Sequence, residues 1–235
     1  MADEQSDGNE DSGNSPDPLN ATQRRILGVL IEKARTTPDA YPLSLNGLLT
    51  GCNQKSNRAP VMNLTAEHLE DELVELRNRG IVAEVHGGGR VPKYRHYGYD
   101  YLGVRGVEAG VMTELLLRGE QSLGDLRSRA SRFEAITDVN ALQSIISSLV
   151  DRKLVVALTP SGRGQMVTHN LYEPDELSAI REAVATGVAS TTTSSPTTSG
   201  PNNALRADVE DLKRQVAALG ETIQKLADRL DRLES

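Results

Sequence analysis

The sequence predicts a mainly α-helical fold with small β-hairpins, which is an α+β architecture. Three observations lead to this prediction. A helical pattern runs directly into a hairpin pattern over residues 65–97, the same order of elements returns later in the chain, and residues 205–235 carry a heptad repeat. A helical unit whose last helix leads into a hairpin is the plan of a winged helix. We therefore expect two tandem winged-helix domains followed by a C-terminal coiled-coil helix.

The helix-to-hairpin unit is clearest over residues 65–97. Three leucines at spacings of four and three share one helical face, and Gly80 ends the helix as a C-cap glycine. An apolar strand over residues 81–85, a run of three glycines and a second strand over residues 91–97 complete a hairpin. The pattern therefore predicts a third helix that continues into a wing.

The same unit returns 73 residues later. The helix of this second copy is also followed by an apolar strand and by a glycine-containing turn, over residues 160–164. One match of this kind would be weak evidence, but the whole order of elements at one offset indicates a repeated domain. The leucines at 69, 73 and 76 correspond to Leu142, Ile146 and Leu149.

Composition excludes few classes of function. The formal net charge is −7, and six acids in the first twenty residues, which hold no Lys or Arg, supply most of it. The remaining chain is close to neutral, so the overall charge argues neither for nor against a nucleic-acid partner. Cys52 is the single cysteine, which fits a reducing compartment, and no apolar run approaches the roughly 20 residues that span a bilayer. We expect a cytoplasmic protein with no membrane partner.

The chain divides into five segments in order. Residues 1–19 are polar and acidic and are expected to be disordered. Thr22 is expected to cap the first helix, and Ser44 and Ser122 the second helices of the two domains. The predicted segments are the acidic tail 1–19, the first winged-helix domain 20–103, the second with a trailing helix 104–185, a flexible linker 186–204, and the coiled-coil helix 205–235.

The first domain carries about five more residues than the second between its second and third helices. This insertion contains Gln54-Lys55-Ser56-Asn57-Arg58 followed by Pro60-Val61, after Pro42-Leu43-Ser44-Leu45-Asn46. These segments resemble the signature of the bacterial YceH family, over roughly residues 19–173. The resemblance implies tandem winged helices and no defined molecular role.

The third helix of the first domain is a poor candidate for DNA contact. A winged helix usually places this helix in the major groove. Here its expected exposed positions are acidic, which would oppose a phosphate backbone. The inserted loop and the wing are the better candidates in this domain, although polar turn residues also brace local backbone. The carboxylates are Glu67, Glu70, Asp71, Glu72 and Glu75, and the candidate contacts are Lys55, Ser56, Asn57, Arg58, Arg90, Lys93, Arg95 and His96.

The second domain offers a different surface. Arginines follow its second helix, and uncharged polar residues lie between the apolar positions of its third helix, residues 138–152. Amide and hydroxyl groups suit base edges and phosphates, although an ordinary solvated helix face would look the same. The candidate residues are Arg127, Arg129, Arg132, Asn140, Gln143 and Arg163, with Ser144, Ser147 and Ser148 beside them.

The last segment predicts a dimer. Its apolar residues alternate spacings of four and three, with β-branched residues at most a positions and leucine at every d position. This pattern favours a parallel two-stranded coiled coil. The seam consists of Leu205, Val209, Leu212, Val216, Leu219, Ile223, Leu226, Leu230 and Leu233.

No catalytic pattern emerges from the chain. The four histidines show no metal-ligand spacing with each other or with Cys52, and the glycines at 87–89 lack the Gly-Lys-Ser/Thr of a phosphate cradle. We therefore expect a non-enzyme without cofactor or metal. The leading prediction is a homodimeric DNA-binding protein that acts as a transcriptional or nucleoid regulator. The alternative is a winged-helix scaffold that binds a protein partner without contacting DNA.

Overall fold

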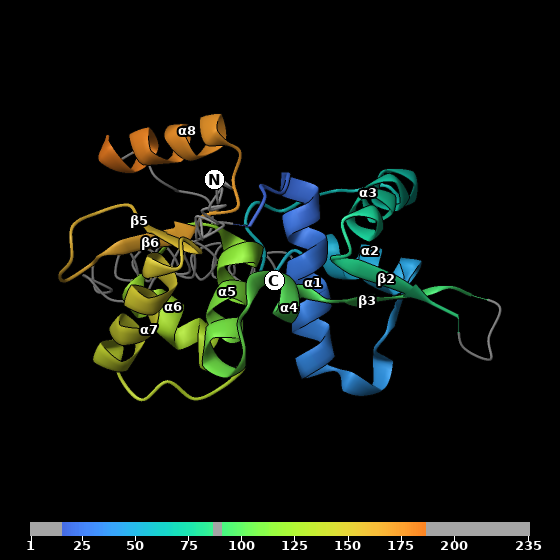
Figure 1. Ribbon diagram of the computed structural model, residues 1–235, viewed down its shortest axis with the longest axis horizontal. Coiled ribbons are helices and arrows are strands. Elements are labelled where there is room, and N and C mark those ends of the chain that lie inside the picture. The colour runs from blue at the N-terminus through green and yellow to red at the C-terminus, as the bar shows by residue number, and fades with distance from the viewer. Residues whose placement is uncertain (1–15, 87–90, 187–235) are drawn as a thin grey trace, which may run out of the picture. The chain divides into compact units, whose positions relative to one another are not determined.

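The computed structural model describes residues 16–86 and 91–186, in a mixed α+β arrangement of helices and small antiparallel sheets (Figure 1). In the first half of the chain two helices precede a third that leads into a hairpin. The third strand lies in the middle of the sheet, in the order β1-β3-β2. The elements are α1 (Ala21–Thr36), the 3-10 helix η1 (Pro38–Ala40), β1 (Leu43–Ser44), α2 (Leu45–Cys52), α3 (Ala66–Asn78), β2 (Val82–Val85) and β3 (Lys93–His96).

The second half repeats this order after the short helix α4 and ends in an additional helix, α8. Its sheet has the order β4-β6-β5, which matches the first sheet strand for strand. We call residues 16–97 the first unit and residues 98–186 the second unit. The elements are α4 (Gly98–Leu102), α5 (Gly106–Arg118), β4 (Gln121–Ser122), α6 (Leu123–Ala130), α7 (Val139–Asp151), β5 (Val155–Ala157), β6 (Met166–His169) and α8 (Pro174–Ala185).

The offset of 73 residues holds in three dimensions. Val82 pairs with His96 in the first hairpin, and Val155 pairs with His169 in the second. The backbone conformation after each third helix also matches. Gly80 and Lys153 follow the caps of these helices, and both have a left-handed φ, of 68° and 55°. The repeat seen in the sequence is therefore a repeat of hydrogen-bonding register as well as of apolar spacing.

An equivalent arginine ends each third helix. Arg79 donates to the main-chain carbonyl oxygens of Pro18 and Asp17, and Arg152 to those of Leu102 and Gly103. Each arginine thus holds the segment that leads into the first long helix of its own unit. In each unit, therefore, an arginine links the end of the third helix to the segment before the first long helix.

Helix caps confirm most of the predicted starts and correct one. The Ser44 and Ser122 hydroxyls accept hydrogen bonds from the Gly47 and Asp125 amides, as expected for N-caps. Helix α1 starts earlier than predicted, because Asn20 is its N-cap in a capping box with Gln23. The predicted cap Thr22 lies inside the helix and is buried.

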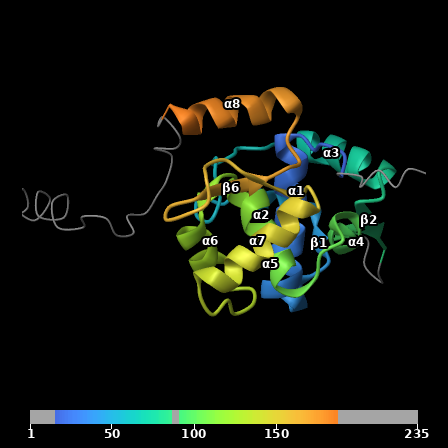
Figure 2. The same cartoon turned by 60° about the vertical axis from the view of Figure 1, so that its left-hand side comes forward.

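Helix α1 is buried on all sides from Thr22 to Glu32, because both units pack around it. It lies beside α5 of the second unit (Figures 1 and 2). Gly28 permits this approach, since a Cβ at that position would lie 2.9 Å from Cδ2 of Leu117. The α1–α5 contact is therefore the central apolar contact between the units.

The chain ends differ in part from the prediction. Residues 16–19, which were assigned to a disordered tail, are attached to the fold through Leu19, which is fully buried and whose amide donates to the carbonyl of Leu171. Helix α8, which was expected to pack against the second unit, has half-buried Leu177 and Ile180, and its Glu176 pairs with Arg24 of α1. Residues 1–15, nearly all of the linker and the whole predicted coiled coil lie outside the described residues.

Candidate nucleic-acid interface

Helix α7 presents an uncharged polar face to solvent. Leu142, Ile146 and Leu149 bury one side of the helix, while Asn140 lies exposed on the other side and Gln143 is half-exposed. Within the described residues, the Asn140 and Gln143 side chains form no hydrogen bond of their own. The helix thus offers amide groups that can donate and accept, the type of group that reads adenine in a major groove.

Serine hydroxyls complete this face. The Ser144 Oγ donates to the carbonyl of Asn140, and the Ser147 Oγ donates to that of Gln143, so each hydroxyl keeps its oxygen as an acceptor. Ser148 is exposed in the next turn. We call Asn140, Gln143, Ser144 and Ser147 the α7 polar face. It carries no charge that would repel a phosphate.

The arginines predicted beside this face have different surroundings. Arg163 is exposed in the β5–β6 turn. Arg127 and Arg129 are half-exposed and brace the unit, donating to the Ile136 carbonyl at 3.4 Å and to Gln121 Oε1 at 2.7 Å. Arg132 lies within ion-pair distance of both Glu32 and Glu114, so its charge is already compensated. The predicted patch therefore reduces to Arg163, with partial exposure of Arg127 and Arg129.

Helix α3 of the first unit presents carboxylates instead. Glu67, Glu70, Asp71 and Glu75 are exposed, as predicted. The exception is Glu72, whose carboxylate accepts from the Asn20 side chain at 2.9 and 3.0 Å and from Gln23 at 2.9 Å. It anchors the start of α1 rather than facing solvent alone. The outward face of α3 is acidic, which disfavours a phosphate backbone.

The inserted loop divides between exposed and structural residues. Lys55 and Ser56 are exposed, so they remain available as predicted. Asn57 is also exposed, with a left-handed φ of 59°, but its Oδ1 accepts from Arg118 of α5. The prediction that Arg58 contacts DNA is wrong, because the residue is 1% exposed.

Arg58 is instead a buried structural cation. Its Nη2 lies 2.5 Å from Glu32 Oε2 and donates to Gln54 Oε1, while its Nε donates to the Gly51 carbonyl. A buried charge must be paired and hydrogen-bonded to be tolerated, and Arg58 meets that requirement. Burial alone would raise the pKa of the Glu32 carboxyl, but Arg58, with Lys33 and Arg132, lowers it below its usual value.

In the first hairpin, Lys93 and Arg95 are exposed on β3, and the Arg95 guanidinium lies 5.2 Å from the centre of the Tyr97 ring. Arg90 lies outside the described residues. The suggestion that His96 joins a DNA surface is wrong, because the side chain is buried and its Nδ1 accepts from the Gly98 amide. His169 occupies the equivalent place in the second unit and accepts from the Leu171 amide.

The two buried histidines predict that the folded protein becomes less stable at acidic pH. Burial, with Arg95 beside it, lowers the pKa of His96 from 6.5 to about 4, and burial lowers the pKa of His169 well below 6.5. The unfolded chain takes up protons at these sites below about pH 6.5, where the folded chain does not. Stability is therefore full above pH 6.5 and falls with decreasing pH, by up to about 3 kcal/mol for His96 alone.

Urea unfolding between pH 4 and pH 7.5 measures this effect. We expect His96→Gln to flatten the pH dependence of the unfolding free energy, because glutamine can accept the same amide but does not titrate. His86→Gln, at an exposed position, is the matched control for the loss of a histidine. An unchanged slope in the His96→Gln protein would contradict the prediction.

Three residues that organise the interior were missed by sequence reasoning. Glu32, Glu114 and Arg118 meet where α1 and α5 come together. Glu114 gave the clearest signal, since it interrupts the apolar run from Val111 to Leu117. A lone acid in a buried helix face requires a cationic partner, which points to a charged contact inside the fold.

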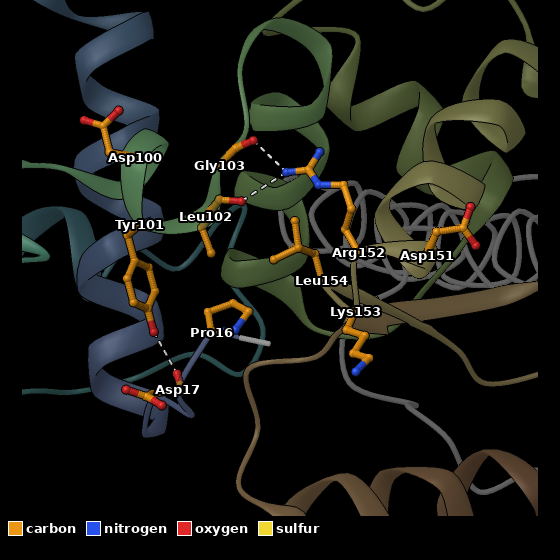
Figure 3. Close-up of a pocket in the computed structure, with 10 residues that line it drawn as sticks. All are labelled: Pro16, Asp17, Asp100, Tyr101, Leu102, Gly103, Asp151, Arg152, Lys153 and Leu154. Carbon is orange, nitrogen blue, oxygen red and sulfur yellow. Dashed lines mark hydrogen bonds between the residues drawn. The ribbon is translucent and has the colours of Figure 1, made fainter. Parts of the chain in front are cut away.

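A cavity of about 540 Å³ opens between the end of α4 and the end of α7 (Figure 3). Its walls come from residues 16–17, from residues 100–103 at the end of α4, and from residues 151–154 at and after the end of α7. The Arg152 guanidinium at its edge donates to the carbonyls of Leu102 and Gly103, and the Tyr101 hydroxyl donates to that of Asp17 (Figure 3). These polar groups hold main-chain segments in place, and the cavity includes none of the predicted site residues.

The described residues show no recognisable metal site and no reactive cysteine. Within residues 16–86 and 91–186, no group of three or more His, Cys, Asp or Glu side chains could hold a metal ion. Burial raises the pKa of the Cys52 thiol to about 12, so the thiol stays protonated at neutral pH, as expected for a core cysteine. The helices of this part of the chain are too short or too polar to cross a membrane.

Comparison with known proteins places the chain in one family. Residues 19–165 match the model of a protein family of unknown function, DUF480. A UPF0502 protein of Rhodopirellula baltica is 47% identical, with 86% of this chain and 85% of the relative covered. The UPF0502 protein of an Acidovorax species is 38% identical (91% and 94% covered), and the UPF0502 protein YceH of Salmonella newport is 37% identical (92% and 95%). These matches confirm the resemblance seen in the sequence, and the chain belongs to the DUF480, or UPF0502, family that includes YceH.

Proposed function

We propose that the chain is a homodimeric DNA-binding protein made of two tandem winged helices, and that it acts as a transcriptional or nucleoid regulator. The observation that carries the proposal is the α7 polar face, together with the exposed Arg163 of the β5–β6 turn. A third helix and a hairpin turn are the parts of a winged helix that approach the major groove and the neighbouring backbone. The second unit is therefore the proposed DNA-contacting unit.

The exposed residues of the first unit play a secondary part in this proposal. Lys55, Lys93 and Arg95 can add phosphate contacts, which position a protein on DNA without reading its sequence. The acidic α3 lies away from the duplex, because its four exposed carboxylates would weaken binding. The proposed DNA contacts therefore lie mainly on the second unit, although the two units have the same topology.

One observation favours a second candidate function. The outward face of α3 is acidic and includes Val74, which is 49% exposed. A surface of this composition suits a basic protein segment better than a nucleic acid. A protein-interaction scaffold without DNA binding is therefore the alternative.

Charge substitutions on the two third helices separate these functions. We expect Asn140→Glu with Ser147→Glu to weaken binding to a DNA duplex about tenfold or more, because two carboxylates would face the phosphates. Both positions are exposed, and Glu at position 140, in the first turn of α7, favours folding of the helix. The comparison variant is Glu70→Gln with Glu75→Gln on α3, which should change affinity less than about threefold.

A gel-shift titration of the full-length proteins provides the readout, with circular dichroism to verify folding. If the α7 and α3 variants change the affinity equally, the α7 polar face is not the DNA surface. If only the α3 variant alters binding, the first unit takes its place.

A further inference from the structure

Two buried carboxylates lie at the contact between the units. Glu32 of α1 is 3% exposed and Glu114 of α5 is fully buried. A single guanidinium joins them, because Arg132 Nη2 lies 3.0 Å from Glu32 Oε1 and 2.5 Å from Glu114 Oε1. Arg132 follows α6 in the second unit, so its contact with Glu32 crosses from one unit to the other.

Each carboxylate also has an arginine from its own unit. Arg58 Nη2 lies 2.5 Å from Glu32 Oε2, and Arg118 Nε lies 3.3 Å from Glu114 Oε2. Arg118 then crosses back to the first unit, where its Nη2 donates to Asn57 Oδ1 at 2.5 Å. Asn57 and Arg58 are neighbours in the chain, so the contacts close into a ring.

Main-chain geometry supports the same junction. The Ala59 amide, one residue beyond Arg58, donates to the Leu117 carbonyl of α5 at 3.0 Å. The loop that carries Asn57 is thus attached to α5 by a backbone and a side-chain hydrogen bond. This loop is about five residues longer than its counterpart in the second unit.

The ring of charged and polar contacts can fix the orientation of one unit relative to the other, which the apolar contact between α1 and α5 does not do. Apolar burial between α1 and α5 is non-directional, so it does not by itself select one orientation of the two helices. The buried carboxylates resist a change of orientation, since Glu32 would lose its hydrogen bonds from Arg58 and Arg132 without regaining water. Glu114 would likewise lose its ion-pair contacts. Such groups contribute little net stability compared with apolar residues of the same shape, but they can select one arrangement among several.

We propose that Glu32, Asn57, Arg58, Glu114, Arg118 and Arg132 form an inter-unit clasp that fixes the orientation of the second unit on the first. On this account, Asn57 and Arg58 of the longer loop serve to build the clasp, while Lys55 of the same loop stays exposed. The clasp thereby sets the relative directions of α3 and α7. This assignment does not depend on whether α7 binds DNA.

The chain contains its own control for the clasp. Arg35 of α1 also crosses between units, donating to the Phe133 carbonyl at 3.0 Å and pairing with Glu134 at 3.2 Å. The Glu134 side chain is 46% exposed, however, so this pair is hydrated. An exposed pair contributes little and fixes little, in contrast to a ring whose two carboxylates are buried.

The test is a distance measurement between the units in the full-length protein. Spin labels are attached at Glu70→Cys on α3 and Ser148→Cys on α7, both exposed, while the buried Cys52 stays in place. Labelled protein is diluted with unlabelled protein so that one labelled chain is present per assembly. Pulsed dipolar spectroscopy then gives the distribution of inter-unit distances without any ligand.

We expect one narrow distribution for the otherwise wild-type chain and for Arg35→Met, and a distribution at least twice as broad for Arg132→Met. Arg132→Lys, which retains the charge but not the fork of donors, should lie between them. Asn57→Gly opens the ring at its edge while keeping a residue that tolerates φ of 59°, so it serves if Arg132→Met does not fold. Equal widths for the clasp variants and Arg35→Met would overturn the proposal.

Discussion

Replacing Arg58 with methionine is expected to lower the free energy of unfolding by about 3 kcal/mol. Methionine fills a similar volume but leaves Glu32 with only Arg132 at 3.0 Å and Lys33 at 3.6 Å. The substitution also removes the donors to Gly51 and Gln54. The expected loss lies at the lower end of the range for breaking a buried ion pair, because Glu32 keeps those two partners.

Lys55→Met is the matched control, since it removes a positive charge from the same loop at an exposed position. Its unfolding free energy should stay within about 0.5 kcal/mol of the wild type. Urea unfolding monitored by circular dichroism compares the two proteins. If Arg58→Met is as stable as Lys55→Met, the guanidinium is not a structural part of the interior.

Deleting residues 200–235 is expected to convert the protein from a dimer to a monomer. The heptad repeat in this segment is the basis for the expectation, and the segment lies outside the described residues. If the dimer presents two α7 faces to one duplex, the deletion should also weaken DNA binding about 100-fold through loss of effective concentration. Light scattering and DNA titration of the same samples measure both effects.

A full-length variant separates loss of the seam from loss of the segment. Val216→Asp with Ile223→Asp places carboxylates at two successive a positions, where like charges would face each other across the seam. Arg214→Asp with Lys225→Asp alters charge outside the seam and is the control. An unchanged mass for both the deletion and the seam variant would contradict dimerisation through this segment.

The sequence was sufficient for features that depend on local spacing. The three leucines of α3, the Gly80 cap and the offset of 73 residues follow from periodicity and turn chemistry, and the structure retains them. The start of α1 was missed because Asn20 and Thr22 are both good caps, and only the contact of Asn20 with Gln23 decides between them. Residues 16–19 were missed because a polar composition hides the single buried Leu19.

The candidate site could be predicted only in part, because charge in a sequence does not reveal burial. Lys55 and Arg58 are three residues apart in one polar loop, yet Lys55 is exposed and Arg58 is buried against Glu32. The partner of Arg58 lies 26 positions away in α1, a long-range pairing that spacing cannot show. The uncharged face of α7 was predictable because helical periodicity alone separates its polar side from Leu142, Ile146 and Leu149.

Binding of the full-length protein to a random-sequence DNA duplex tests the central claim most directly. Fluorescence anisotropy at about 50 and 200 mM salt reports both the affinity and its dependence on released counterions. The account predicts micromolar binding at the lower salt concentration that weakens at least tenfold at the higher one. An absence of binding at 50 mM salt would contradict DNA binding and would leave the acidic face of α3 as the surface to pursue.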